Sequence, residues 1–136
     1  MILVDTSIWV KFFNRARDTQ AVHLHDLIER GAAVALTDLV LTEILQGIQD
    51  EHRFGAARRN LLDFPIFRAE GLETFVHAAQ LHRRCRRAGF TVRTTVDCII
   101  AAVAIEHGLD LFHDDRDFDA IARCAPLTIY RVPTTT

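Results

Sequence analysis

The chain has little lysine, cysteine, proline or glycine. Of its 16 basic residues only Lys11 is a lysine, and its 136 residues include three cysteines, three prolines and six glycines. The cysteines are far apart and form no Cys-x-x-Cys pair, which argues against a disulfide framework and against a structural zinc site. Because proline and glycine are scarce, the sequence shows no linker and no low-complexity stretch. We also find no internal repeat.

Long apolar runs and an excess of charge of one sign are missing as well. No window approaches the roughly 20 apolar residues that span a bilayer, and the opening MILVDTSIWV lacks the basic start of a secretory signal. We therefore expect a soluble, cytoplasmic protein with no membrane partner. The net charge of −2 does not indicate a general nucleic-acid binder, so any such contact must come from local patches.

What is present is a markedly apolar chain of ordinary domain length. It is 49% hydrophobic and 25% charged, which is enough to bury a core and too apolar for disorder. We expect residues 1–136 to form a single domain.

Short apolar runs alternate with helical patterns along the chain. We expect strands at residues 1–4, 33–37, 109–112 and 127–132, with an extended segment at 64–69. Helical spacing or an apolar character all round predicts helices at residues 7–13, 19–31, 39–48, 52–62, 72–88, 96–108 and 118–124. Strands that alternate with helices predict a parallel sheet covered on both faces, that is, an α/β three-layer sandwich.

Acidic side chains recur where these strands end or these helices begin. Asp5 directly follows the first strand, and Asp97 opens an apolar helix. Residues 114–119 contain four aspartates, among them Asp115 and Asp117, directly after another strand. Since ligands of parallel sheets bind outside the carboxyl ends of the strands, we expect these acids to gather at one edge of the sheet.

Each acid also has an ordinary structural role open to it. Asp5 is placed to cap the next helix, and Thr94 and Asp97 have the spacing of a capping box. Asp117 is placed to cap the last helix. Glu43 points away from the apolar stripe of its helix, as a solvated surface acid does.

Capping alone does not explain the whole set. Two unit charges about 4 Å apart repel by about 4 kcal/mol at an effective dielectric constant of 20, whereas a cap contributes about 1 kcal/mol. If Asp5, Asp97 and Asp115 meet, they are either partly protonated or joined by a divalent cation. Carboxylate ligands without nitrogen or sulfur favour Mg²⁺ or Mn²⁺.

These motifs resemble those of PIN-domain ribonucleases, of the VapC type that acts as the toxin in bacterial toxin–antitoxin pairs. The stretch ILVDTSIWV is similar to the family's opening strand and first acid, and TEILQG to its helix with a glutamate. The stretch TTVDCIIAAVAIEHGLDLFHDDRDFDAIA is similar to the family's C-terminal segment, which includes Asp-x-Asp-Phe. The resemblance covers nearly the whole chain and implies a PIN-like, Rossmann-like sandwich.

Carried over position by position, the resemblance implies a metal-dependent endoribonuclease. It assigns catalytic roles to Asp5, Glu43, Asp97 and Asp115. The same four acids and Asp117 would bind Mg²⁺, for which Mn²⁺ would substitute. A metal-bound water would attack the RNA phosphodiester, oriented by Asp97 or Glu43, and leave a 5′-phosphate and a 3′-hydroxyl.

The resemblance also concerns residues next to the acids. Thr6 or Ser7 would supply a hydroxyl to the water shell of the metal. The chain departs from the family at His113, where threonine or serine is usual. This histidine would either hydrogen-bond the substrate phosphate or replace a structural hydroxyl.

RNA must be attracted to an acidic site, so arginines should border it. Arg93 and Arg116 stand near the acids in sequence, although Arg116 would equally suit an internal ion pair. The further candidates are Arg83, Arg84, Arg86 and Arg87. These four also suit the last turn of a helix, where cations favour the helix dipole.

The partners that the resemblance implies are an RNA substrate, a small antitoxin protein, a second copy of the chain in a homodimer and a larger toxin–antitoxin complex. We expect an apolar antitoxin helix against the early helices, with a basic side chain that reaches the acids. Trp9, Phe12 and Phe13 are candidates for that groove, with burial in the core as the alternative.

Other classes of function fit less well. A dehalogenase-like phosphatase needs a second aspartate where Ser7 stands, and a phosphoacceptor receiver domain needs a lysine late in the chain, whereas the only one is Lys11. No histidine falls in a His-Glu-x-x-His motif, so zinc catalysis is not expected. The main alternative is a catalytically silent PIN fold that binds RNA or protein.

Overall fold

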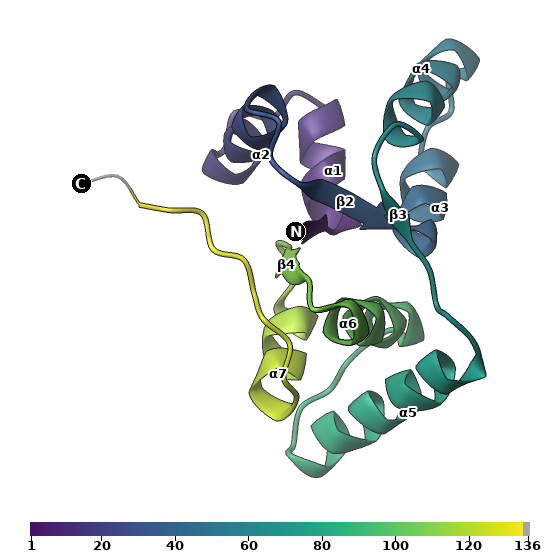
Figure 1. The fold of residues 1–136 in the computed structure, drawn as a ribbon, viewed down its shortest axis with the longest axis vertical. Helices are drawn as coiled ribbons and strands as arrows, with labels where there is room; N and C mark the ends of the chain where they lie inside the picture. The colour runs from purple at the N-terminus through teal and green to yellow at the C-terminus, as the bar shows by residue number, and fades with distance from the viewer. Residues whose placement is uncertain (135–136) are drawn as a thin grey trace.

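A computed structural model describes residues 1–134, so residues 135–136 of the expected domain lie outside the described part. Four short parallel strands form the central sheet in the order β3-β2-β1-β4 (Figure 1). They are β1 (Ile2–Val4), β2 (Val34–Thr37), β3 (Ile66–Phe67) and β4 (Asp110–Phe112). In the register of the sheet, Leu3 lies opposite both Ala35 and Leu111. The expected parallel sheet is confirmed, and β1 lies inside it.

The helices form two groups on opposite sides of the sheet (Figure 1). On one side lie α1 (Thr6–Phe13), α2 (Thr19–Glu29), α3 (Asp38–Gln46) and α4 (Glu51–Leu61). On the other lie α5 (Leu72–Arg87), α6 (Thr95–His107) and α7 (Arg116–Cys124). This division follows from right-handed crossovers, because the chain moves in one direction from β1 to β3 and returns across the sheet to β4. The three-layer sandwich is therefore confirmed.

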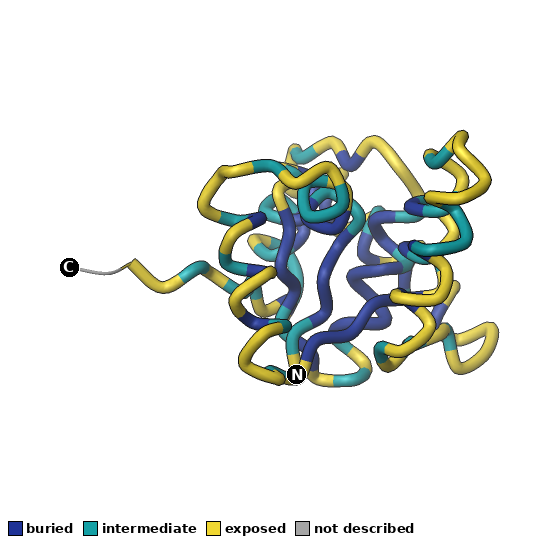
Figure 2. The backbone as a smooth tube through the Cα atoms, turned by 90° about the horizontal axis from the view of Figure 1, so that it is seen from above, coloured by how far each residue is buried: buried dark blue, intermediate teal, exposed yellow. Residues whose placement is uncertain are grey.

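The core lies between the sheet and both helical groups, and buried backbone fills the middle of the molecule (Figure 2). Leu3 and Val4 of β1 have no exposed surface. Helix α6 is apolar on nearly every face because it packs against α5, α7 and the sheet. The C-terminal end of α2 is completed by Gly31, whose φ of 69° is the left-handed conformation that glycine adopts most readily.

The expected strand at residues 127–132 is reduced to a single parallel bridge between Ile129 and Leu111. The Leu111 N–H donates to the Thr128 carbonyl, and the Tyr130 N–H donates to the Leu111 carbonyl. On its other edge, β4 pairs with β1 at all three of its positions, whereas this segment pairs at one. No helix of the described residues combines the length and the apolar character needed to cross a bilayer.

Candidate active site

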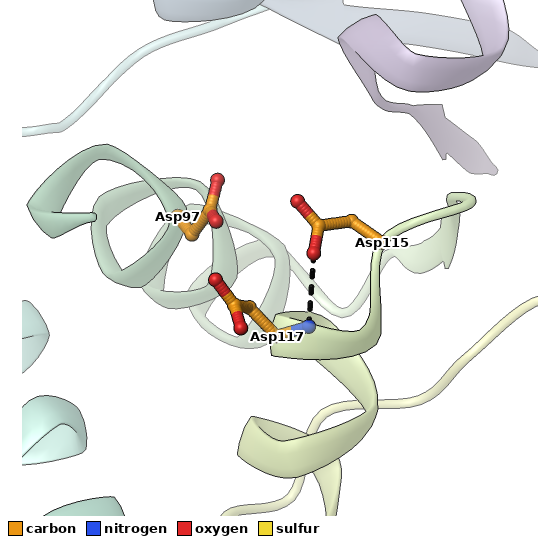
Figure 3. Close-up of side chains that lie close together, drawn as sticks. All are labelled: Asp97, Asp115 and Asp117. Atoms are coloured by element: carbon orange, nitrogen blue, oxygen red, sulfur yellow. Dashed lines mark hydrogen bonds between the residues drawn. The ribbon is translucent and has the colours of Figure 1, made fainter. Parts of the chain in front are cut away.

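Three aspartates converge where α6 and α7 begin (Figure 3). One oxygen from each of Asp97, Asp115 and Asp117 lies within 4.8 Å of the others. Asp97 is in the first turn of α6, Asp115 is the N-cap of α7, and Asp117 is in the first turn of α7. Two helix N-termini thus adjoin this group, and their amide dipoles favour negative charge there.

Local hydrogen bonds hold the three side chains in place. Thr94 caps α6, since its Oγ1 accepts from the Asp97 N–H at 3.2 Å. Asp115 caps α7, because its Oδ1 accepts from the Asp117 N–H at 3.0 Å. The capping role considered for Asp117 is therefore wrong, because Asp115 occupies that position. The carboxylate of Asp117 is left to face the other two acids.

Asp5 and Glu43 form an adjoining pair outside this tight group. The Thr6 hydroxyl donates to Glu43 Oε1 at 2.7 Å, which links α1 to α3. Asp5 caps α1, and its Oδ2 accepts from both the N–H and the hydroxyl of Ser7 at 3.1 and 2.7 Å. Both hydroxyls that the resemblance placed in a metal's water shell therefore donate to carboxylates in this structure.

Ser7 also joins Asp5 to the loop that follows β4. Its Oγ accepts from the Asp114 N–H at 2.9 Å while its hydroxyl donates to Asp5. The Asp5 N–H in turn donates to the Phe112 carbonyl at the end of β4. The ends of β1 and β4, which are 107 residues apart at this contact, are thus fastened together.

Burial and mutual repulsion raise the pKa values of the three acids that form no ion pair with Arg93. The pKa of Asp97 is raised to about 7, first by burial and then by the charges of Asp115 and Asp5. Burial also raises the pKa of Asp5, against the hydrogen bonds from Ser7. The pKa of Glu43 is raised chiefly by burial and further by Asp5. Buried carboxylates of this kind fit a hard divalent cation, which supplies the missing positive charge through oxygen ligands.

The arginine that pairs with the cluster is Arg93. Its Nε lies 3.1 Å from Asp117 Oδ2, and one terminal nitrogen lies 3.3 Å from Asp115 Oδ1. Its backbone N–H also donates to Asp117 at 3.2 Å. The internal ion pair considered for Arg116 is thus made by Arg93 instead. Since more than half of its side chain is exposed, Arg93 lies on the solvent side of the cluster.

His113 makes a hydrogen bond of the kind expected if it replaces a structural hydroxyl. Its Nδ1 accepts from the Asp115 N–H at 2.9 Å, as a threonine or serine hydroxyl would at this position. Its Nε2 lies 3.3 Å from Asp119, and its side chain is only 4% exposed. Burial lowers its pKa, and its hydrogen bond with the Asp115 N–H holds the loop that presents Asp115.

The four arginines of α5 do not reach the acids. Arg83 and Arg86 line a cavity between α5 and α6, and none of the four forms an ion pair with the acidic cluster. Two residues that the sequence analysis did not consider, Phe90 and Arg123, lie beside Asp117 in another cavity. The signal in the sequence that could have indicated Arg123 is its spacing of seven residues from Arg116 on one helix.

Comparison with known proteins places this geometry in a family. The family model described as PIN domain matches residues 2–123. The chain belongs to the PIN domain family. This PIN domain is 40% identical to ribonuclease VapC11 of Mycobacterium tuberculosis over 128 residues, 93% of the chain and 96% of the relative. It therefore belongs among the VapC ribonucleases.

Solved structures share the fold of this PIN domain at low sequence identity. VapBC2 of Rickettsia felis, bound to a DNA fragment from its promoter, has a TM-score of 0.74 at 19% identity. The match covers 96% of this chain and 98% of the solved chain. VapC20 of Mycobacterium tuberculosis, described as a toxin that cleaves the sarcin–ricin loop, has a TM-score of 0.68 at 20% identity. This match covers 88% of this chain and 94% of the VapC20 chain.

Proposed function

We propose that this PIN domain is a metal-dependent endoribonuclease. The observation that carries the proposal is the convergence of Asp97, Asp115 and Asp117, with oxygens within 4.8 Å of one another. The raised pKa of Asp97, about 7, supports it, because such a group needs a proton or a cation. The 40% identity to a relative named a ribonuclease supports RNA as the substrate.

The three aspartates would hold Mg²⁺ or Mn²⁺, since they offer only oxygen ligands. When bound, such an ion lowers the pKa of a coordinated water and stabilises charge on the phosphate. Asp5 adds negative charge beside the group and is held by Ser7. Arg93 neutralises the outer side of Asp115 and Asp117, which lessens the repulsion of an incoming phosphate.

Glu43 is the residue that we assign to orienting the attacking water. Thr6 holds its Oε1, so Oε2 is the oxygen that would accept from the water. The raised pKa of this carboxyl makes it a better proton acceptor than an ordinary glutamate. The thiol of Cys98, which follows Asp97 in the chain, is not a nucleophile, because burial raises its pKa to about 11.

We assign the antitoxin to a cavity of about 460 Å³ between α1 and α2. Phe12, Phe13 and Val22 line it, and an apolar helix would bury their exposed surface. Trp9 does not take part, because it is fully buried and packs against Phe13 and Phe64. Homodimers and larger toxin–antitoxin complexes remain part of the proposal, supported by the VapBC complexes that share the fold.

The test is cleavage of a structured RNA by purified protein in Mg²⁺ or Mn²⁺. We expect Asp97→Asn and Asp5→Asn each to lower kcat/KM at least about 100-fold, because loss of a negative charge at or beside the cation site removes several kcal/mol of transition-state stabilisation. Asp63→Asn, an exposed aspartate outside the site, is the matched control and should cleave like the wild type. EDTA should abolish cleavage.

Two outcomes contradict the proposal. Equal cleavage by the wild type and all three variants would mean that a contaminating nuclease cleaves the RNA. No cleavage by wild-type protein under any of these conditions, while RNA still binds, would favour the catalytically silent PIN fold.

A further inference from the structure

A cavity of about 520 Å³ opens directly beside the acidic cluster. Its walls come from α7 and from the segment between α5 and α6, and the residues that matter are Phe90, Arg93, Arg116, Asp117, Ala120 and Arg123. Asp117 belongs both to this cavity and to the cluster. A ligand that fills the cavity therefore lies beside the candidate active site.

One face of α7 forms a wall of this groove. Arg116, Ala120 and Arg123 are spaced by four and three residues, so they lie along the same helix face. The two arginines are about 10 Å apart along the helix axis at 1.5 Å per residue. Ala120 stands between them and takes little room, so the groove stays open there.

Phe90 stands next to this row of arginines. The guanidinium carbon of Arg123 lies 5.5 Å from the centroid of the Phe90 ring, in a cation–π contact. The ring is partly exposed and packs against the core. An aromatic ring beside arginines offers both stacking surface and positive charge, which are the two features that bind single-stranded nucleic acid.

The charges in the groove leave two cations for a ligand. Arg93 is engaged by Asp115 and Asp117, and Asp119 lies 3.6 Å from Arg131. Within residues 1–134, Arg116 and Arg123 have no carboxylate within ion-pair distance. Both side chains are exposed, and both line the cavity that adjoins the cluster.

We propose that this groove binds the nucleotides next to the scissile phosphate of a single-stranded RNA segment. Arg116 and Arg123 contact backbone phosphates, and Phe90 stacks on an unpaired base. Such contacts read the backbone and the flat face of any base, so they add affinity with little base preference. Cleavage of that phosphate rests on the proposed function, whereas the binding of RNA in the groove is tested separately.

The binding test uses fluorescence anisotropy with the full chain in EDTA, so that RNA is not cut. The probes are labelled single strands of about 12 nucleotides, one of uridylate and one of adenylate. Arg116→Ala and Arg123→Ala should each weaken binding about 5-fold or more and reduce the salt dependence of log K by about 0.7. Both probes should respond alike. Phe90→Leu should weaken binding by about 5-fold to 100-fold, through the loss of base stacking.

Controls separate binding from folding and from overall charge. Arg58→Ala removes one exposed arginine from α4, on the other side of the sheet, and should change affinity by less than about twofold. Phe90→Leu keeps an apolar side chain against the core, and thermal unfolding of each variant checks that it is folded. In Mg²⁺, the groove variants should raise KM for RNA more than they lower kcat.

Wild-type affinity and salt dependence in all three groove variants would overturn the inference. A strong preference for one probe that the arginine variants abolish would also overturn it, since it would indicate reading of base edges. If wild-type protein cleaves RNA while the groove variants bind normally, the inference fails and the proposed function stands. If the variants lose RNA affinity but wild-type protein never cleaves, the groove stands as an RNA-binding site and the proposed catalysis fails.

Discussion

Asp97 illustrates how a single residue is held in an unfavourable state by its surroundings. It lies in the first turn of α6, where its N–H donates to Thr94, and it is 9% exposed. Asp115 and Asp117 face it, so burial and two like charges act against its ionisation. A position that is unfavourable for a charged group in the protein alone becomes favourable once a cation joins the three carboxylates.

The first prediction concerns the pH dependence of stability in metal-free protein. Because the pKa of Asp97 is raised from 3.8 to about 7, the folded state keeps a proton that the unfolded chain releases. Stability should therefore fall as pH rises through the window from about 4 to 7, by up to about 1.4 kcal/mol per pH unit from this group, and level off above it. Urea unfolding in EDTA, followed by the fluorescence of buried Trp9, measures this.

Asp97→Asn provides the comparison for that measurement. The variant lacks the titrating group, so its stability should vary less across the same pH window and exceed that of the wild type above about pH 7. Parallel curves for the two proteins would contradict the assignment of the raised pKa to Asp97.

The second prediction concerns the thiols. Burial raises the pKa of Cys85 to about 12 and that of Cys98 to about 11, whereas Cys124 is partly exposed. A disulfide reagent such as Ellman's should therefore titrate one thiol in native protein and three in denaturant. Loss of the fast-reacting thiol in Cys124→Ala would identify it. Rapid reaction of two or three native thiols would contradict the packing of α5 against α6 and α7.

At the scale of elements, the loop after β4 is fastened to α1 and α2 by the only lysine in the sequence. Lys11 Nζ lies 2.6 Å from both Asp18 and Asp114 and donates to Gln20 at 3.0 Å. Asp18 is also the N-cap of α2. One side chain of α1 thus joins the start of the next helix to the loop after β4. Ser7 of the same helix accepts a hydrogen bond from the Asp114 N–H in that loop.

The third prediction follows from this contact. Lys11→Met keeps the apolar stem of the side chain and removes its charge, so two partly exposed ion pairs are lost. We expect the free energy of unfolding to decrease by about 1 kcal/mol at low salt and by less at high salt. Arg30→Met removes an exposed pair within α2 and serves as the control, with an expected change below about 0.5 kcal/mol. An equal effect of both substitutions would remove the special role of Lys11.

At the scale of the whole molecule, the strand order brings the acids together. β1 pairs with both β2 and β4, so Asp5, at the end of β1, lies beside the loop that follows β4. Helix α6 crosses back under the sheet before β4 (Figure 1), which brings Asp97 to the same edge. Acids as far apart in sequence as Asp5 and Asp97 thereby act on each other's charge.

The fourth prediction concerns binding of a divalent cation by the folded molecule. Mn²⁺ at about 100 times its Kd should stabilise the protein by about 2.7 kcal/mol, because only the folded state assembles the site. For a domain of this length the melting temperature should rise by roughly 5 to 10 °C, and EDTA should reverse the shift. Asp97→Asn should shift far less, while Asp63→Asn should shift like the wild type. An equal shift in both variants would mean that the cation binds elsewhere.

Much of this molecule was predictable because its patterns are local. The apolar run at β1 and the all-round apolar α6 predicted a buried parallel strand and a buried helix, and the structure confirms both. The family resemblance rested on short motifs around Asp5, Glu43, Asp97 and Asp115, and the matching family model confirms it. Their catalytic roles remain predictions, as does metal binding by Asp117.

The predictions that were wrong concern interactions between elements. The helical wheel made Glu43 a surface acid because a wheel takes account of one helix only, whereas packing of α1 on α3 half-buries it beside Thr6. Arg116 is adjacent to two acids in sequence, yet Arg93, more than 20 residues away, forms the ion pairs. The strand expected at 127–132 shrinks to a bridge, because only Ile129 of this segment pairs with β4.

By itself, the sequence determined the four strands of the sheet, the helices, the family and the set of candidate acids, because apolar periodicity and short motifs depend only on neighbours along the chain. Only the tertiary structure decided that three aspartates form the tight group while Asp5 and Glu43 stand beside it. It also decided that His113 hydrogen-bonds the Asp115 N–H and that Phe90 and Arg123 share a groove. These are distances between residues far apart in sequence. They are set by the order of the strands and by the packing of helices across the sheet.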